Sequence, residues 1–328
     1  MSIFLYLVFS RIAFAADDCS TTPDLSKDLG VVHDQECSNW CGYFTATDML
    51  TLKMKQTGHL KGIERVHPLM VSSVTMIHED KTPDPTNKDG GSPVASFIAI
   101  SRTDDFNRKI CREEDLSPET GIKNPIFAKS AEEAKRLTDD PPPAPEGENF
   151  CDTPGKLIKD RLATEVFAAT RGTWIASLRN ACKTGTPLLK WWNQFDEKRY
   201  AALMAKDPPP VDRKLAEEFR GNIDYAFRTG ALPAVLFNSK FLYDPKRKKT
   251  AKELECNRSM SESKVGSMHW ATLVARRRNA QGVCEYKLRN STGKSCEGWL
   301  KPEKCEDGYH WIPRDVLEEK MANVQYLE

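Results

Sequence analysis

The chain has 328 residues, which is enough for one large domain or two modest ones at about 150 residues per domain. Its net charge of +1 gives no electrostatic reason to expect nucleic acid or an anionic membrane as a partner. The sequence has no apolar run long enough to cross a bilayer, so we expect no membrane span. Nothing in the composition indicates a cofactor or an oligomeric state.

The first residues follow the pattern of a secretory signal. An apolar run over 1–10 leads to a site of the A-x-A type at 13–15, and we expect cleavage after Ala15. Arg11 interrupts the apolar region and no basic residue precedes it, so a misassigned start codon is the alternative. All ten cysteines follow the site, which suits an oxidising compartment. We therefore expect a secreted or periplasmic protein.

One cysteine stands where a tight polar loop runs into a helix. The stretch 34–48 contains this junction, with Cys41 at the helix start and Gly58 as the expected end of the helix. A thiol at a helix start lies at the positive end of the helix dipole, which favours the nucleophilic thiolate. Gln35 precedes it by six positions. The alternative is that Cys37 and Cys41 are disulfide partners or zinc ligands.

The middle of the chain changes in composition. A loop rich in glycine and proline contains Gly90 and Gly91, and a buried element follows at 94–100. From 120 to 212, two proline runs punctuate charged stretches, of which 157–182 and 186–206 carry helical apolar spacing. We expect this part to form a small helical unit that restricts access to the rest of the protein.

The last third of the chain predicts one helix followed by strands. The helix covers 215–228, and the strands are expected at 232–237, 267–276, 285–290 and 308–312. Helix followed by strands favours an α+β architecture with antiparallel pairing. Among the remaining cysteines, we expect Cys296 to pair with Cys305 across a short loop and, second, Cys111 with Cys151.

Two polar residues of these strands suit a nucleophilic cysteine. His269 opens one predicted strand, and Asn290 ends the next. A nucleophile needs a base, and the base needs an orienting partner. Antiparallel neighbours would bring the amide of Asn290 against the ring nitrogen of His269 that faces away from Cys41. An amide oxygen fixes the imidazole tautomer without adding a charge.

Taken together, these residues resemble papain-like cysteine peptidases. The order Gln35, Cys41, His269, Asn290 is similar to that family's order, and residues 290–293 are similar to its Asn-Ser-Trp-Gly motif. The glycine pair at 90–91 is similar to a pair that binds extended substrate by its main chain.

The resemblance implies a papain-like two-lobed α+β fold with a helical insertion. It divides the chain into a signal peptide (1–15), a first part with the nucleophile helix (16–119), a helical insertion rich in proline (120–212) and a β lobe (213–328). Members of that family usually carry a long inhibitory pro-segment after the signal, but cleavage after Ala15 leaves only a short stretch before Gln35, so we expect no pro-segment here.

For function, the resemblance implies a cysteine-type peptidase that acts on a protein or peptide and needs no metal or cofactor. Cys41 would be the nucleophile, His269 the base, Asn290 its orienting partner and Gln35 an oxyanion donor. Trp270, which follows the base, would border a substrate side-chain pocket, and Gly90 and Gly91 would bind the substrate main chain.

Two departures from the family pattern keep other functions open. Thr292 replaces the tryptophan that shields the His–Asn pair, and Lys88 replaces a cysteine before the glycine pair. A catalytically inactive papain-like binding protein is one alternative. A cysteine amidase or transpeptidase that acts on cell-wall peptides is another, because the same residues serve a different acyl donor.

Overall fold

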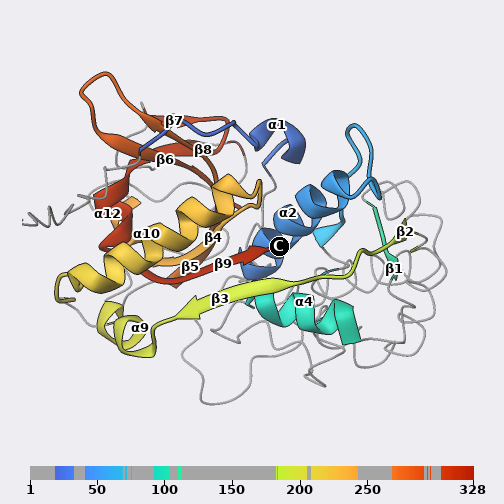
Figure 1. The fold of residues 1–328 in the computed structure, drawn as a ribbon, viewed down its shortest axis with the longest axis horizontal. Coiled ribbons are helices and arrows are strands. Elements are labelled where there is room, and N and C mark those ends of the chain that lie inside the picture. The colour runs from blue at the N-terminus through green and yellow to red at the C-terminus, as the bar shows by residue number, and fades with distance from the viewer. Residues whose placement is uncertain are drawn as a thin grey trace, which may run out of the picture.

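The computed structural model of the chain describes residues 19–32, 41–68, 71, 75, 92–102, 109–112, 182, 184–204, 208–242, 268–291, 294, 296 and 304–328. Within these residues, the fold joins a helical lobe to a lobe built on one antiparallel sheet (Figure 1). The α+β class predicted from the sequence is therefore confirmed.

A seven-stranded antiparallel sheet forms the larger lobe, with the strand order β3-β9-β4-β5-β6-β8-β7. The strands are β3 (Trp191–Phe195), β4 (Ala234–Asn238), β5 (Met268–Arg278), β6 (Cys284–Arg289), β7 (Cys305–Glu306), β8 (Tyr309–Pro313) and β9 (Met321–Leu327). Every residue of β4 and of β9 is buried, so both strands are covered on their two faces.

The two longest described helices cover opposite faces of this sheet. Helix α2 (Cys41–Gln56) packs on the face that presents Leu236 and Trp270, and α10 (Arg213–Arg228) packs on the face that presents Phe237 and Leu273. Each face belongs to one hydrophobic cluster because side chains alternate along a strand. The shorter helices around the sheet are α9 (Glu197–Leu203), η4 (Ser239–Leu242) and α12 (Arg314–Glu318).

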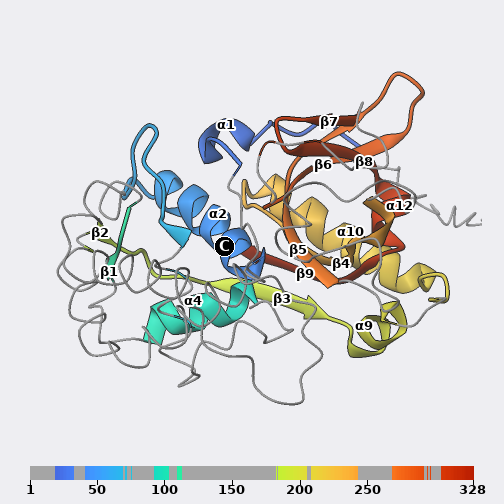
Figure 2. The ribbon, with the colours of Figure 1, turned by 180° about the vertical axis from the view of Figure 1, so that it is seen from behind.

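The helical lobe is organised around α2, which is buried on almost all sides. Helices α4 (Pro93–Arg102) and α1 (Ser26–Leu29) both pack against α2, as Figures 1 and 2 show from the two sides. A small ladder of β1 (Lys109–Ile110) and β2 (Thr184–Gly185) adjoins the disulfide between Cys111 and Cys182.

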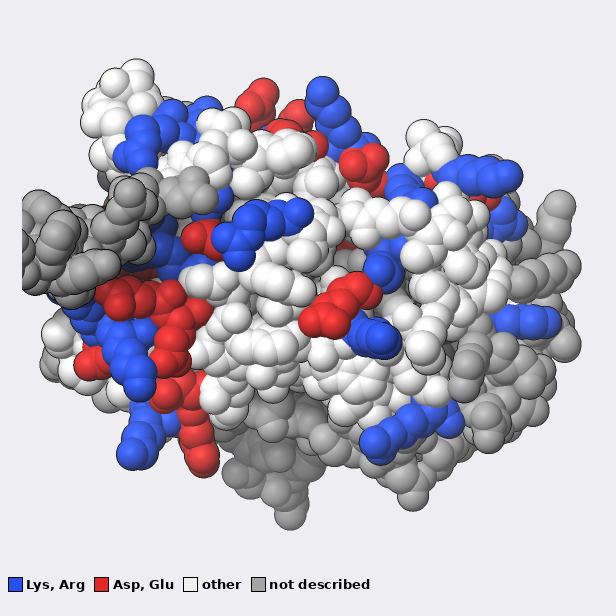
Figure 3. Space-filling model, in the orientation of Figure 1, with Lys and Arg blue, Asp and Glu red and all other residues white. Residues whose placement is uncertain are grey.

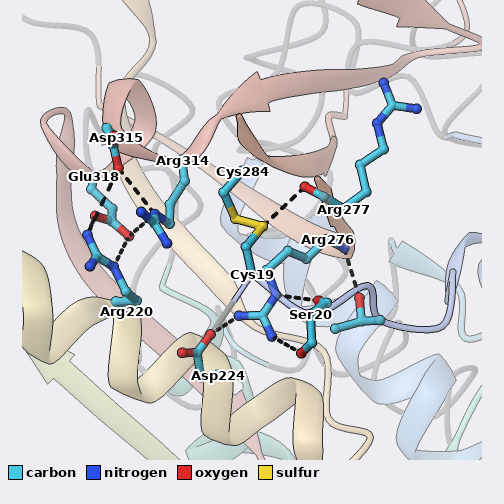
Figure 4. Close-up of polar contacts among 11 residues, drawn as sticks. Cys19, Ser20, Arg220, Asp224, Arg276, Arg277, Cys284, Arg314, Asp315 and Glu318 are labelled. Carbon is cyan, nitrogen blue, oxygen red and sulfur yellow. Dashed lines mark hydrogen bonds and ion pairs between the residues drawn. A yellow bond between two sulfur atoms is a disulfide. The ribbon is translucent and has the colours of Figure 1, made fainter. Parts of the chain in front are cut away.

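Residues 19–32 form a strap along the sheet. Strand β4 pairs with β5 only as far as Thr272, which leaves the later part of β5 with an open edge. The strap covers that edge, since the amides of Thr22 and Leu25 donate to the carbonyls of Arg276 and Val274 at 3.0 and 2.9 Å. Unpaired strand edges are otherwise prone to association. A disulfide between Cys19 and Cys284 fixes the start of the strap (Figure 4).

A network of ion pairs lies where α10 and α12 meet the sheet (Figure 4). Arg220 of α10 donates twice to the buried carboxylate of Glu318, with N–O distances of 2.7 and 3.2 Å. In a second pair, Asp224 of α10 binds the guanidinium of Arg276, which also donates to Ser20 of the strap. These contacts hold α10 against both the sheet and the strap.

The predicted strands of the last third are confirmed as β4, β5, β6 and β8, and the helices expected at Cys41 and at 215–228 are α2 and α10. The helical expectation for 186–206 is wrong at Trp191–Phe195, which is strand β3 of the main sheet. Among the described residues of that stretch, only Glu197–Leu203 is α-helix. Residues 157–181 and the signal at 1–15 lie outside the described residues.

Three disulfides join described cysteines. The pair Cys296–Cys305 is confirmed. The expected pairing of Cys111 with Cys151 is wrong, because Cys111 binds Cys182 instead. The sequence analysis also missed the link of Cys19 to Cys284, which spans 265 positions and depends on the strap. Disulfides suit an oxidising compartment.

Charge is distributed without a dominant sign on the face drawn in Figure 3, where acidic and basic side chains alternate with wide uncharged areas. On α10, Arg213 and Glu217 form an exposed ion pair four residues apart, with an N–O distance of 2.8 Å. Within the described part of the chain, no helix is long and apolar enough to span a membrane.

The two buried glutamates of the sheet lobe predict opposite pH effects. Burial raises the pKa of Glu318 above its ordinary 4.5, although Arg220 opposes the shift. Stability from such a group is present below pH 4.5 and is lost as the pH rises through the raised pKa. Wild type should therefore lose stability relative to Glu318→Gln as the pH rises from 4.5, in urea unfolding at several pH values.

Glu285 supplies the control of opposite sign. Burial there favours the neutral form, but hydrogen bonds from Lys304, Asn279 and Arg277 outweigh it and lower its pKa. Its stabilisation is lost as the pH falls through the lowered pKa, so wild type should gain stability over Glu285→Gln as the pH rises. The stability difference between wild type and variant should change with pH in opposite directions for Glu318→Gln and Glu285→Gln. If both differences change in the same direction, at least one of the two assignments is wrong.

Candidate active site

The predicted nucleophile, Cys41, is the first residue of α2 and is 7% exposed. Its sulfur is not part of a disulfide. The interpretation of Cys41 as half of a disulfide is therefore wrong for this structure. As the first residue of the helix, Cys41 lies at the positive end of the helix dipole, which favours the thiolate over the thiol.

Helix α2 contacts the strand that carries the predicted base. It packs against β5, and Cys41 belongs to the same hydrophobic cluster as Trp270 of that strand. His269 immediately precedes Trp270 and is 3% exposed. The start of the helix and the start of the strand thus belong to one packed region.

His269 and Asn290 are brought together as the sequence predicted. The Nε2 of His269 lies 2.5 Å from the Oδ1 of Asn290, and both side chains are buried. This contact follows from antiparallel pairing of β5 with β6, since Asn290 directly follows the last residue of β6. The hydrogen bond joins the start of β5 to the residue that follows the end of β6.

A second hydrogen bond fixes the orientation of the Asn290 amide. The main-chain N–H of Ser291 donates to the same Oδ1 at 2.8 Å, and a backbone N–H requires an acceptor. The atom that faces His269 is thus the amide oxygen, which accepts only. Nε2 of His269 must carry the proton of this bond, which leaves Nδ1 to exchange a proton with another group.

An aromatic side chain closes the His269–Asn290 pair on one side. Phe237 pairs across the strands with His269, and its ring meets the imidazole edge-on with a centroid distance of 5.8 Å and an interplanar angle of 86°. Phe237 is fully buried, and Asn290 is only 1% exposed. The bond is therefore shielded from water, although Thr292 replaces the tryptophan of the family motif.

The sequence analysis missed Phe237 in this role. It predicted a strand over 232–237 but had no means to set the register between that strand and the next. The alternation of apolar residues indicates which side chains of a strand share a face, but it does not say which residues of two strands lie opposite each other. Only the observed pairing of β4 with β5 puts Phe237 opposite His269.

Trp270 is only 5% exposed, and it pairs across the strands with Leu236. Its indole belongs to the core cluster that contains Cys41. Gln35, Gly90 and Gly91 lie outside the described residues, so their roles stay predictions.

A buried glutamine holds the chain just after the predicted glycine pair. Gln325 of β9 is 1% exposed, and its Oε1 accepts from the N–H of Val94 at 3.2 Å. Its Nε2 donates to Ser92 at 3.3 Å and to Asn193 at 2.9 Å. The contact caps the start of α4, and no local sequence signal indicates it because the partners are 231 to 233 positions apart.

Chemically, the arrangement offers a thiol at a helix start and an oriented, buried imidazole on the strand that this helix contacts. These are the parts of a nucleophile and a general base. Within the described ranges, no group of three or more His, Cys, Asp or Glu side chains is arranged to hold a metal ion.

Comparisons with known proteins give no family model and no curated protein that matches the chain. The chain is similar to the structure of the cysteine protease Amb a 11, a ragweed pollen allergen, in its proform. That likeness has 12% identity and a TM-score of 0.44, and it covers 96% of this chain and 67% of that one. A second likeness is to bromelain from Ananas comosus in complex with the E64 inhibitor, with 12% identity and a TM-score of 0.45, over 94% and 98% of the two chains.

Removing the amide of Asn290 should disable the imidazole without removing the thiol. We expect Asn290→Ala to lower turnover about 10²-fold or more, because His269 loses the bond that fixes its tautomer. Alkylation of the variant followed by peptide mapping should still find label on Cys41.

Asn238→Ala is the matched control, because Asn238 is also buried and its amide also binds main chain, at Leu203. That variant should lose stability while keeping turnover. Equal turnover losses in the two variants would remove the special role of Asn290.

Proposed function

We propose that the chain is a cysteine-type peptidase of the papain-like kind, in which Cys41 is the nucleophile and His269 is its base. The observation that carries the proposal is the shielded 2.5 Å bond from His269 to Asn290, on the strand that the Cys41 helix contacts. The bond assigns the Nε2 proton and leaves Nδ1 for catalysis. The order of residues along the sequence supports the same function.

The proposed reaction is acyl transfer to sulfur followed by hydrolysis. The Cys41 thiolate attacks the peptide carbonyl and forms a carbon–sulfur bond, while His269 gives its proton to the leaving amine. The oxyanion accepts hydrogen bonds from the Cys41 main-chain N–H and the Gln35 side chain, and each such donor is worth about 3 kcal/mol of barrier. Water, deprotonated by His269, then cleaves the thioester and restores the thiol.

The protein is proposed to be exported, with residues 1–15 as the signal. The three disulfides fit an oxidising compartment, and the +1 net charge gives no reason to expect a polyanionic partner. Residues 120–212 are proposed as an insertion, with its end anchored in the main sheet because β3 pairs with β9. The substrate is a protein or peptide.

Labelling of the thiol is the first test of the proposed function. Full-length protein in reducing buffer should react with an epoxide inhibitor at Cys41 and should cleave a mixed peptide library. The variants Cys41→Ser and His269→Ala should lose hydrolysis, because each lacks one partner of the proton transfer.

Three results would separate the alternatives. Failure of Cys41 to react would favour an inactive binding protein. Reaction without peptide cleavage, but with release of acyl groups from peptidoglycan fragments, would favour an amidase or transpeptidase. Cleavage of ordinary peptides supports the peptidase.

Trp270 predicts the substrate preference. In papain-like peptidases, the residue after the catalytic histidine borders the pocket for the substrate side chain one position removed from the cleaved bond. An indole at that position would make the pocket small. We expect a preference for small apolar residues there, which Trp270→Leu should relax toward larger ones in a peptide library. Leu is preferable to Ala in this test because it fills more of the space left by the indole. Truncating a buried Trp to Ala costs about 3–5 kcal/mol of stability.

A preference for Phe or Leu in wild type that Trp270→Leu leaves unaltered would refute this role. Leu236→Val, on the strand opposite Trp270, is the control for general loosening of the core.

A further inference from the structure

Arg289 has an unusually complete set of partners for a buried charge. It is the last residue of β6 and is 2% exposed. Its Nε donates to Asp48 at 2.8 Å, Nη1 to Gly30 and Tyr309 at 2.8 and 2.5 Å, and Nη2 to Val31 and Leu29 at 2.8 and 3.5 Å. A guanidinium has five N–H groups, so each one has an acceptor.

One of these acceptors lies on the helix that begins with the proposed nucleophile, and three lie on the strap that precedes that helix in the chain. Asp48 lies on α2, about two turns after Cys41 and thus on the same side of the helix. Gly30 and Val31 end the strap, from which the chain continues toward Gln35 and Cys41. Arg289 itself is bonded to Asn290 through one peptide link.

The ion pair is strong enough to act as a fixed point. Burial opposes the charge of Arg289, but Asp48 and Tyr309 outweigh it and raise the pKa of the guanidinium. Asp48 is itself buried. A buried carboxylate that loses its partner is strongly destabilised, so the two side chains hold each other in one geometry.

The backbone of the strap is shaped to meet this arginine. Gly30 has φ of +65°, in the left-handed region that other residues rarely adopt, and a Cβ there would meet Arg65 at 3.4 Å. This conformation lets successive carbonyls of the strap face one guanidinium. Tyr309 adds a bond from its hydroxyl to the Gly30 carbonyl at 3.2 Å.

We propose that Arg289 is a positioning residue that sets the Cys41 helix in register with the His269–Asn290 pair. The inference rests on the proposed function. A lysine at the same position would keep the charge but lose the planar fork, so it would not satisfy all five acceptors. The helix and strap would then settle independently of Asn290, and an error of about 1 Å in such a geometry costs about 10²-fold in rate.

Arg276 supplies a matched control (Figure 4). It is 3% exposed, pairs with Asp224 and donates to Ser20 at the other end of the same strap. Its hydrogen bonds among the described residues go to Ser20 and Thr22 of the strap and to Asp224 of α10, and it lies on β5, fourteen positions before Asn290. Arg289→Lys and Arg276→Lys therefore disturb similarly buried ion pairs, and of the two only the Arg289 pair links the Cys41 helix to the residue next to Asn290.

The experiment measures four quantities for wild type and both variants of the full chain. They are the midpoint of thermal unfolding, kcat and KM on a fluorogenic peptide, and the rate of Cys41 alkylation by iodoacetamide between pH 5 and 9. Both variants should lower the midpoint. Arg289→Lys alone should lower kcat by about 10- to 100-fold with little change in KM.

Alkylation separates positioning from stability. In wild type, a thiolate held by His269 should react well below the ordinary thiol pKa of about 8.5. Arg289→Lys should lose this reaction on the acid side, and Arg276→Lys should keep it. Parallel behaviour of the two variants in kcat and in alkylation would overturn the inference.

Two further results keep the test decisive. If Arg289→Lys does not fold, Tyr309→Phe removes only the hydroxyl that binds Arg289 and Gly30, and it should still lower acid-side alkylation. Unchanged alkylation in that variant would then overturn the inference. Wild type that neither alkylates at low pH nor cleaves peptide would instead contradict the proposed function, whatever the variants do.

Discussion

A buried guanidinium can keep its charge only where acceptors surround it, and that requirement orders the centre of this protein. Arg289 draws its acceptors from the strap, from α2 and from β8. These segments are distant in sequence, separated by as many as 279 positions between Gly30 and Tyr309. The arginine therefore couples the helical lobe to the sheet lobe at the edge where His269 and Asn290 lie.

The two lobes also depend on unequal strand lengths. Strand β5 has eleven residues and β4 has five, so part of β5 would have an open edge. The strap closes that edge and thereby leads the chain to the start of α2. The unequal lengths of β4 and β5 thus affect where the proposed nucleophile lies. The strap that closes the open edge of β5 ends at Arg289, which is next to Asn290 in the chain, and the strap precedes the Cys41 helix.

Local patterns in the sequence predicted the elements that have local causes. Alternating apolar residues predicted β5 and β6, and the apolar spacing before Gly230 predicted α10. The aromatic edge strand β3 was read as helix, because the apolar residues of 186–206 fit a helical spacing and its partner β9 lies more than a hundred positions away. Pairing across that distance has no signature in a short window.

The candidate site divides in the same way. Cys41, His269 and Asn290 were found from their order and from motif residues near them. Phe237, Arg289, Asp48 and Gln325 were missed, because each acts through a partner that only the strand register or the strap brings near. Residues that do chemistry have recognisable types, whereas residues that hold them do not.

The His269–Asn290 pair has a physical cost for the core of the protein. Both side chains are buried against Phe237, and within the described residues the Nδ2 of Asn290 has no hydrogen-bond acceptor. An orphaned buried donor costs about 1–3 kcal/mol, so apolar residues here would make a more stable core. A polar pair at this position makes physical sense where the imidazole must hold one proton and exchange another. The proposed function gives the pair that role, because His269 is then the base of Cys41.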